Sequence, residues 1–276
     1  MAGGTPKRGA RLPTSVALLA RLPVFQPTQR ATSRVDDARA NAWGSVCVSG
    51  RLGQRHADVL EAILFHAQAT HEGADGTLHV LVDPARVRRT LSDAGHDSKR
   101  IRAWIEELIN ARVNVSAPRL ALEGTLLSGW RETDKATRRN PLTGGERRLW
   151  VVTLGPLLVK LIAADSIKRY HDPRHVACLI HGVSQAVARH VLTHRQEPPG
   201  GWTLDGLIGI VAGDLAGHVL RDRRRDLRAD AEGLARLGIQ VTGDRVRLVV
   251  QRPGSVAQNT DPVVQSPGVV VHRPGG

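Results

Sequence analysis

Cysteine, tyrosine and long apolar runs are scarce in this chain of 276 residues. Its two cysteines, Cys47 and Cys178, lie far apart in apolar sequence, which argues against a disulfide framework and against a cysteine zinc site. The longest apolar run near the start, Val16 to Ala20, is too short for a signal-peptide core. Nowhere do about 18 apolar residues run together, as a membrane helix would require. We therefore expect a protein of the reducing cytoplasm, without a membrane segment.

Two catalytic signatures are absent as well. No GxxxxGK[ST] loop occurs, so we expect no ATP hydrolysis by this chain. A DNA-nicking enzyme needs a nucleophilic tyrosine and two histidines that flank one apolar residue, but the sequence offers only Tyr170 and no such histidine pair. His175, Cys178 and His181 follow one another in steps of three, which on a helix spreads the outer pair by about 120° and opposes a metal site. We expect no catalytic residue, no metal and no cofactor, and we interpret Tyr170 as a core or interfacial aromatic.

Positive charge, in contrast, is abundant. The 39 Lys and Arg residues outnumber the 26 Asp and Glu residues, which gives a formal net charge of +13 and a pI near 11.2. Most of the cations are arginine, whose planar fork suits phosphates and guanine edges. We expect a polyanionic partner, although a ribosome-type or merely soluble basic protein has the same balance of charge.

Composition and periodicity divide the chain into four parts. Residues 1–44 hold seven Lys or Arg residues against two Asp and show no sustained period, so we interpret them as a disordered basic arm. Residues 45–154 and 155–252 are predicted to be two globular domains. Residues 253–276, rich in Pro, Gly, Gln and Val, are interpreted as a disordered tail.

Helix and strand signals occur in a similar order in both domains. In the first domain we expect a helix from Gln54, a strand over Leu78 to Asp83 and a helix from Pro84 to about Asp93. A helix capped by Asp97 or Ser98, a hairpin within Val113 to Trp130 and a long polar surface loop follow. In the second we expect a long helix over Asp172 to Arg195, a short helix from Thr203 to Val211 with Thr203 as its cap, an arginine-rich helix over Val219 to Gly238, and strands over Ile239 to Val241 and Arg245 to Val250.

The two halves can be aligned on two short apolar strands. Setting residues 113–115 against 239–241 places Ile101 over Leu227 and Leu108 over Leu234, each time within a short helix, a break, a long helix and a strand. We interpret this as two copies of one winged-helix unit, and chance likeness between two three-helix units is the alternative. The predicted fold class is α+β, with two tandem winged-helix domains that are mainly helical and carry short β-hairpin wings.

The arginine-rich helix has its charges sorted by face. On a period of 3.6 residues its apolar residues form one stripe, its arginines lie about 100° around from that stripe, and Asp222, Asp226 and Asp230 share a third face. A helix that is merely solvated usually interleaves opposite charges at i,i+4 spacing. The long helix of the first domain does mix its signs, with Lys99 and Arg102 beside Glu106. The second helix is therefore the better candidate for the major groove, where arginine pairs with guanine.

The DNA contacts predicted from this pattern are basic residues of the helix, of the following hairpin and, with weaker support, of the first domain. They are His218, Arg221, Arg223, Arg224, Arg225, Arg228, Arg245, Arg247, Lys99 and Arg100. The helix residues would reach base edges or phosphates, and Arg245 and Arg247 would lie along phosphates or enter the minor groove. The alternative is that these arginines bind the acidic residues of a partner protein.

Several stretches resemble a known family, the replication initiators of IncQ-type plasmids called RepC, and more loosely other plasmid initiators with two winged helices. The resemblance covers roughly residues 50–250, and its most specific part is the arginine run from Arg221 to Arg228 that precedes Leu234 to Val241. Asp222 and Asp226 within that run depart from the family pattern.

The resemblance implies a bacterial protein that binds repeated duplex sequences at a plasmid origin and helps to open an adjacent AT-rich segment. Double-stranded origin DNA and a replicative helicase would be its partners, and in related initiators the first winged helix often serves a homodimer. No nuclease or ATPase activity is implied. A winged-helix transcription regulator is the alternative, because it would present the same DNA-binding elements.

Overall fold

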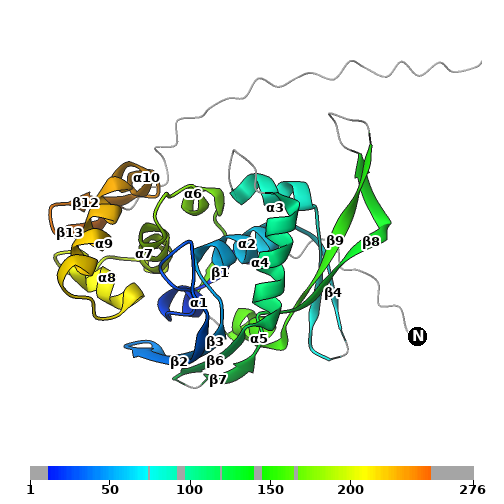
Figure 1. The fold of residues 1–276 in the computed structure, drawn as a ribbon, viewed down its shortest axis with the longest axis horizontal. Helices are drawn as coiled ribbons and strands as arrows, with labels where there is room; N and C mark the ends of the chain where they lie inside the picture. The colour runs from blue at the N-terminus through cyan, green and yellow to red at the C-terminus, as the bar shows by residue number, and fades with distance from the viewer. Residues whose placement is uncertain are drawn as a thin grey trace, which may run out of the picture.

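The computed structural model describes residues 12–73, 75–91, 97–118, 120–139, 145–164 and 167–249. The fold is α+β, as expected from the sequence, with mostly antiparallel sheets. It is 41% helix and 33% strand, so the expectation of a mainly helical protein with short hairpins underestimates its sheets. Two bodies lie side by side, which we call the first and the second unit (Figure 1). No helix in these ranges is long and apolar enough to cross a membrane.

The first unit packs helices against two four-stranded antiparallel sheets. Its helices are α2 (Gln54–Phe65), α3 (Pro84–Leu91), α4 (Ser98–Asn110) and α5 (Pro156–Ala164). One sheet has the order β2 (Arg34–Asn41), β3 (Gly44–Gly50), β6 (Arg112–Ala117) and β7 (Leu120–Gly124). The other has the order β4 (Ala67–Glu72), β5 (Leu78–Val82), β9 (Glu146–Leu154) and β8 (Leu127–Arg139).

The second unit has its own apolar core and a small three-stranded sheet. Its helices are α6 (Arg174–Ala177), α7 (Gly182–Leu192), α8 (Leu204–Ala212), α9 (Gly217–Ala229) and α10 (Ala231–Arg236). The sheet has the order β11 (Trp202–Thr203), β13 (Arg245–Leu248) and β12 (Ile239–Thr242). The expected cap of α8 is confirmed, because the Thr203 hydroxyl accepts a hydrogen bond from the Gly206 amide at 3.1 Å.

The interpretation of residues 1–44 as a disordered arm is wrong for residues 12–41. This N-terminal segment forms β1 (Ser15–Val16), α1 (Ala17–Arg21) and β2, and β1 pairs with β10 (Lys168–Arg169). Its apolar residues are buried in the core, although they lack a regular period because strand, turn and a short helix follow one another within a few residues. The Arg21 side chain donates to the Thr193 hydroxyl at 2.9 Å, so the segment also contacts the second unit. Residues 1–11 and the predicted tail, 253–276, lie outside the described ranges.

Two helices that the sequence predicts as continuous are interrupted. The stretch 172–195 contains the short α6 and then α7, and the arginine-rich stretch divides at Asp230 into α9 and α10. Asp230 leaves the helical conformation (φ −91°, ψ 10°), and its carboxylate accepts hydrogen bonds from the amides of Ile180 (3.1 Å) and His181 (2.8 Å). The residue at which the arginine-rich helix is interrupted thus provides hydrogen-bond acceptors for backbone amides at the start of α7.

The polar stretch after Trp130 is not a loose excursion. Residues 127–139 and 146–154 form β8 and β9, a long twisted hairpin that extends beyond the body of the first unit (Figure 1). Cross-strand ion pairs such as Arg148 with Asp134, 3.0 Å apart, join exposed positions of the two strands. Alternating charged residues on exposed strands lack the apolar signal by which strands are recognised in sequence.

The internal similarity seen in the sequence corresponds to similar element orders. A short helix, a longer helix and a strand follow one another as α3, α4 and β6 in the first unit. In the second unit the order is α8, α9 and β12, with the additional short helix α10 between α9 and β12. The aligned residues Ile101, Leu108, Leu227 and Leu234 all have 0% exposure. The apolar positions of the alignment therefore mark core positions in both units.

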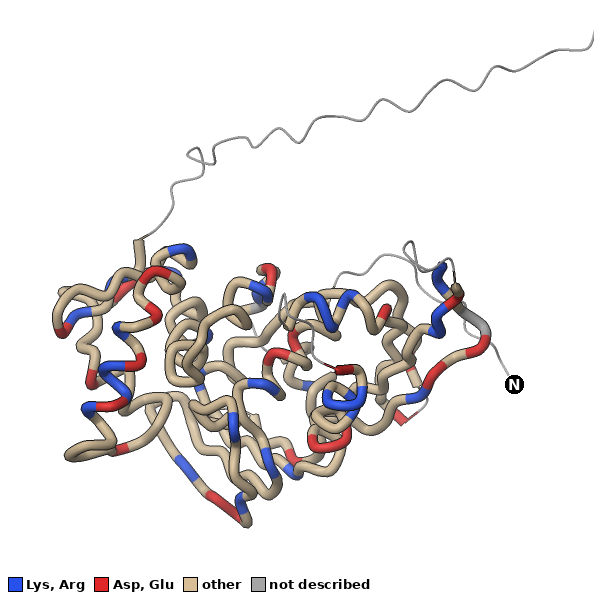
Figure 2. Tube along the Cα trace, turned by 45° about the horizontal axis from the view of Figure 1, so that its top comes forward, with Lys and Arg blue, Asp and Glu red and all other residues tan. Residues whose placement is uncertain are grey.

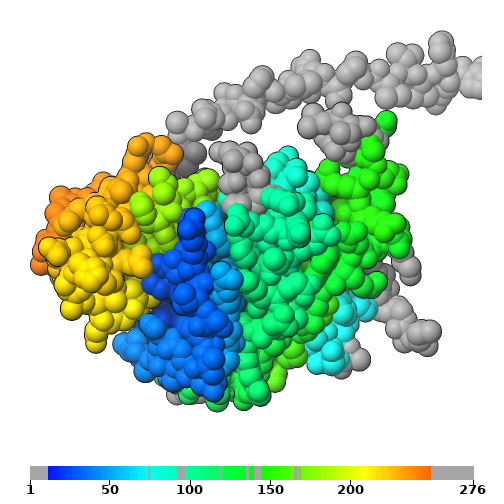
Figure 3. All heavy atoms as spheres, viewed as in Figure 1, coloured from blue at the N-terminus to red at the C-terminus, as the bar shows by residue number. Residues whose placement is uncertain are grey.

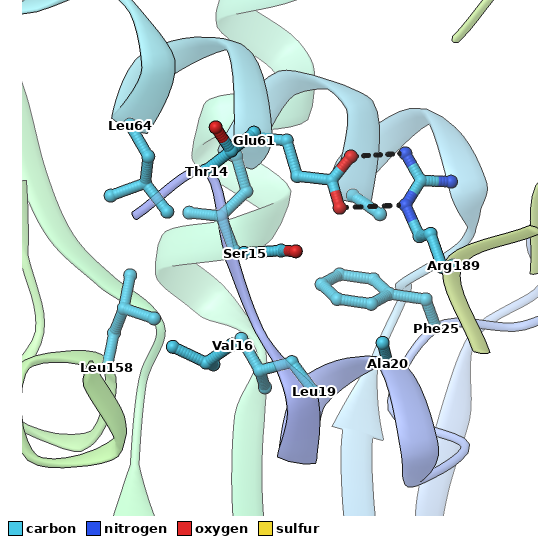
Figure 4. Close-up of a pocket in the computed structure, with 12 residues that line it drawn as sticks. Thr14, Ser15, Val16, Leu19, Ala20, Phe25, Glu61, Leu64, Leu158 and Arg189 are labelled. Carbon is cyan, nitrogen blue, oxygen red and sulfur yellow. Dashed lines mark hydrogen bonds and ion pairs between the residues drawn. The ribbon is translucent and has the colours of Figure 1, made fainter. Parts of the chain in front are cut away.

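A buried ion cluster joins the two units through α2 and α7. The Arg189 guanidinium of α7 binds Glu61 through Nε (3.0 Å) and Nη2 (2.8 Å), and Asp58 through Nη2 (2.6 Å). Its Nη1 donates to Gln54 at 2.7 Å, and all four side chains are buried. Figure 4 shows the fork between Arg189 and Glu61 beside Phe25 of the N-terminal segment. Burial, helped by the negative charge of Glu61, raises the pKa of the Asp58 carboxyl, and the positive charges of Arg189 and Arg55 oppose that rise.

Candidate nucleic-acid interface

Helix α9 lies at the outer edge of the second unit, and basic and acidic residues alternate along it in Figure 2. Leu227 is its one fully buried residue, and α7 and α8 pack against its inner side. Near the start of the helix His218 and Arg221 are exposed, and Arg225 and Arg228 follow on the outward side. The element that the sequence singles out is therefore available for contact with a large partner.

The arginines of α9 divide into outward and flanking groups. Arg221 has no ion-pair partner among the described residues, and Arg225 keeps 74% of its side chain exposed while it pairs with Asp222 at 3.3 Å. Arg224 instead turns to α8, where its Nε donates to Asp205 at 2.6 Å and its Nη2 completes a bidentate pair. This pair lowers the pKa of the Asp205 carboxyl, chiefly through the hydrogen bond. Arg224 is therefore engaged in an intramolecular ion pair with Asp205, which the sequence pattern does not indicate.

The acidic residues of the third face have structural partners. Asp226 lies 3.7 Å from the Arg223 guanidinium and 3.7 Å from Nδ1 of His181, and Asp230 binds the amides at the start of α7. Arg223 is consequently held on the inner flank of α9. Asp222 alone among the three acids is exposed, so the outward surface is more basic than the sequence of the helix indicates.

The hairpin β12–β13 stands next to α9 and is tied to it. Arg228 donates from Nη2 to the carbonyl of Gly243 in the turn, at 3.2 Å. Val246 of β13 is buried, whereas Arg245 and Arg247 on either side of it are exposed. The alternation of side chains along a strand puts both arginines on one face. The structure therefore brings helix and hairpin arginines to neighbouring elements, as expected.

The two candidates in the first unit lie apart from this surface. Lys99 and Arg100 are exposed at the first turn of α4, and the Arg100 guanidinium lies 5.9 Å from the Trp104 ring centroid. Glu106 accepts a hydrogen bond from the Trp130 indole and Glu107 binds His56. The acidic residues that give α4 its mixed charge therefore form hydrogen bonds to β8 and α2.

A second set of arginines was missed by the sequence reasoning. Arg86, Arg88 and Arg89 are exposed on α3, which contains no acidic residue. The sequence signal was present in PARVRRTL, but α3 is shorter than the helices on which charge sorting was judged. Close to this helix, burial and the charges of Arg86 and Arg174, with Asp172 opposing them, lower the pKa of His66 to about 4.

The structure corrects two interpretations made from the sequence, one of Tyr170 and one of the spacing of His175, Cys178 and His181. Tyr170 is 51% exposed and is therefore not a core residue. His175 belongs to α6, whereas Cys178 and His181 precede α7, so the spacing argument for a single helix does not apply to them. Among the described residues, no group of three His, Cys, Asp or Glu side chains could hold a metal ion.

Comparison with solved structures gives a shared fold. Domains 2 and 3 of RctB, in a selenomethionine crystal structure, match with a TM-score of 0.50 and 12% identity over 80% of this chain and 85% of theirs. A second RctB structure, of residues 155–483, matches with a TM-score of 0.47 and 13% identity over 82% and 84%. No family model and no curated protein sequence matches the chain. At this level of identity the likeness concerns the fold.

Proposed function

We propose that this protein is a plasmid replication initiator that binds repeated duplex sequences at an origin. The outward arginines of α9, beside a basic hairpin, carry the proposal. The α+β fold shared with two domains of RctB, a DNA replication initiator, supports it. The proposal includes two tandem winged helices, of which the second unit is the specific DNA reader, and the similar order of helices and strands in the two units supports it.

In this mechanism α9 enters the major groove. Arg221 and Arg225 reach base edges from the outward side of the helix, where a guanidinium can bind both acceptors of guanine. Arg245 and Arg247 of the hairpin contact phosphates along one flank. The hydrogen bond from Arg228 to Gly243 keeps helix and hairpin at a fixed distance while both are engaged.

The first unit has a supporting role in this proposal. Lys99, Arg100 and the arginines of α3 contact DNA phosphates, or the unit joins two copies of the chain at adjacent repeats. Opening of AT-rich DNA and delivery of a helicase follow once several copies are bound. Neither step needs nuclease or ATPase chemistry from this chain. These finer properties, like the assignment to the IncQ RepC type, come from the sequence resemblance.

Selection of binding sites from a random duplex library tests the DNA-binding function. We expect one enriched motif, and Arg221→Ala or Arg225→Ala should lower affinity for it roughly 5- to 150-fold per lost base contact. Arg112→Ala is the matched control, because Arg112 is 73% exposed on β6 and pairs with Glu123. The log–log dependence of affinity on salt should be steep, with about 0.9 per phosphate contact. Unchanged affinity in both α9 variants would refute the assignment.

Replication separates an initiator from a transcription regulator with the same fold. The gene and its flanking DNA are placed on a plasmid that lacks any other initiator. Maintenance of that plasmid by the wild type, and its loss with the Arg221→Ala/Arg225→Ala pair, is expected. If the protein binds its selected motif but the plasmid is not maintained, the regulator is the better assignment.

A further inference from the structure

A cleft of 180 Å³ separates the N-terminal segment from the α8–α9 part of the second unit. Arg34 and Arg39 stand on one wall, and Val219 and Arg223 of α9 stand on the other. In Figure 3 the N-terminal segment, in blue, lies directly beside the yellow residues of α8 and α9. At about 30 Å³ per water molecule in the liquid, the cleft has room for a small organic group.

The charge of the lining has one sign. Three arginines line the cleft, and none of its lining residues is acidic. The carboxylates that pair with these arginines are not part of the cleft lining. Asp37 lies 3.0 Å from Nε of Arg39, and Asp226 lies 3.7 Å from Nη1 of Arg223. Arg39 also donates from Nη1 to the carbonyl of Ala212 at 3.4 Å, which leaves its Nη2, and Nε and Nη2 of Arg223, without a recorded partner in the described part of the chain. Such guanidinium donors can bind an anion.

Arg34 supplies an independent observation. Its side chain is only 7% exposed, and its terminal nitrogens bind the carbonyls of Pro23 and Val24 and the carboxylate of Asp37. Its Nε is buried and has no hydrogen-bond partner within the described ranges. A buried donor without an acceptor destabilises a fold. Arg34 lines the cleft, so its positive charge acts on an anion bound there, whereas the Nε atom itself has almost no accessible surface and does not face the open space.

Most of the remaining lining is apolar, and Gln26 and Thr28 are its uncharged polar residues. Phe25 and Pro23 face the cleft from the N-terminal segment, and Val211, Leu215 and Val219 face it from the second unit. Val219 is 36% exposed, which is unusual for a large apolar residue in this structure. Apolar walls around a few convergent polar groups are typical of small-molecule sites.

We propose that this cleft binds a small organic anion, with a carboxylate or phosphate on an apolar body, and that the bound anion weakens DNA binding by α9. The first part stands without the proposed function, and the second part rests on it. The anion would contact α9 directly at Val219 and Arg223. It would also bring negative charge within a Debye length of the outward arginines, and so oppose the approach of DNA phosphates.

Three probes with one aromatic body test the site. Phenyl phosphate, benzoate and neutral benzyl alcohol are titrated into the full chain without DNA, with binding followed by calorimetry. Both anions should bind at least tenfold more tightly than the alcohol. Arg39→Gln and Arg223→Gln should each weaken anion binding at least fivefold. Arg236→Gln, which removes an exposed arginine of α10 paired with Glu232, should leave it unchanged. Equal binding of all three probes, or full affinity in both cleft variants, overturns the site.

A second measurement tests the link to DNA. Saturating phenyl phosphate, compared with sulfate at equal ionic strength, should lower affinity for the selected duplex two- to threefold, and Arg39→Gln should abolish this effect. Anion binding without a change in DNA affinity overturns the regulatory part alone. If no probe binds while Arg39→Gln weakens DNA binding, the cleft receives a DNA phosphate, and the small-anion site is refuted. If the protein binds anions but no DNA at all, the proposed function fails and the site stands.

Discussion

Replacing Arg189 by methionine should be among the most destabilising single changes in this protein. The guanidinium binds Glu61 and Asp58 at 2.6 to 3.0 Å, and those carboxylates are 5% and 0% exposed. Methionine keeps much of the length of the side chain but leaves two buried carboxylates without their main counter-charge. Removal of one partner from a buried pair typically costs about 3 to 5 kcal/mol. Arg55, 3.3 Å from Asp58, compensates in part, so we expect about 3 kcal/mol.

The measurement is equilibrium unfolding in urea, with a thermal scan beside it. For a protein of this size about 3 kcal/mol corresponds to a decrease in Tm of roughly 6 to 12 °C. The loss should shrink as the pH falls from 8 towards 5. Without the opposing charge of Arg189 the pKa of Asp58, already raised by burial, rises further, so the variant can neutralise this buried carboxylate by taking up a proton.

A charge-matched combination separates lost charge balance from lost packing. Arg189→Met together with Asp58→Asn and Glu61→Gln removes all three charges at nearly constant volume, and we expect it to recover most of the stability. If the triple variant is no more stable than Arg189→Met, packing and not charge explains the loss. A single-variant loss below about 1 kcal/mol would refute the argument altogether.

Two further predictions concern the second unit. Burial lowers the pKa of His190, which is 1% exposed, to about 4, with nearby His194 and Arg21 adding to the shift. Because the unfolded chain binds this proton near pH 6.5, the folded state should lose about 2 kcal/mol between pH 7 and pH 5. His190→Leu should flatten that slope in urea titrations, and an unchanged slope would contradict the assignment. Asp230→Ala removes two hydrogen bonds to the start of α7 and should cost about 2 kcal/mol in thermal unfolding. Asp222→Ala, at an exposed position of α9, is its control and should have an effect of less than about 0.5 kcal/mol.

Elements with a regular apolar period could be predicted from the sequence. The core faces of α4 and α9 follow from residues such as Ile101 and Leu227, and the cap of α8 from Thr203. The outer part of the β8–β9 hairpin could not, because its exposed charged residues give no apolar alternation. The N-terminal segment was misjudged because its apolar residues fill gaps between distant elements, and such contacts leave no local period.

In the candidate site, too, some features could be predicted from the sequence and others could not. The exposure of Arg221, Arg225 and Arg228 agrees with the helical period, but the pairing of Arg224 with Asp205, 19 residues away, depends on how α8 packs. In the sequence Asp230 is one of three acids on a common face of the predicted helix. Its role at the start of α7 requires a contact across about 50 residues, which no helical wheel contains.

The placement of the N-terminal segment has a consequence for how the chain folds as it is made. Thr14 binds the carbonyl of His171, and Arg21 binds Thr193, so these early residues find partners 157 and 172 positions later. During synthesis they leave the ribosome long before these partners, and the two contacts cannot form until the partners have followed. Closing such long loops costs entropy before any contact repays it, which slows folding. The apolar residues of this segment are exposed until the residues of the first-unit core that cover them have been made, and the nascent chain is most vulnerable to aggregation in that interval.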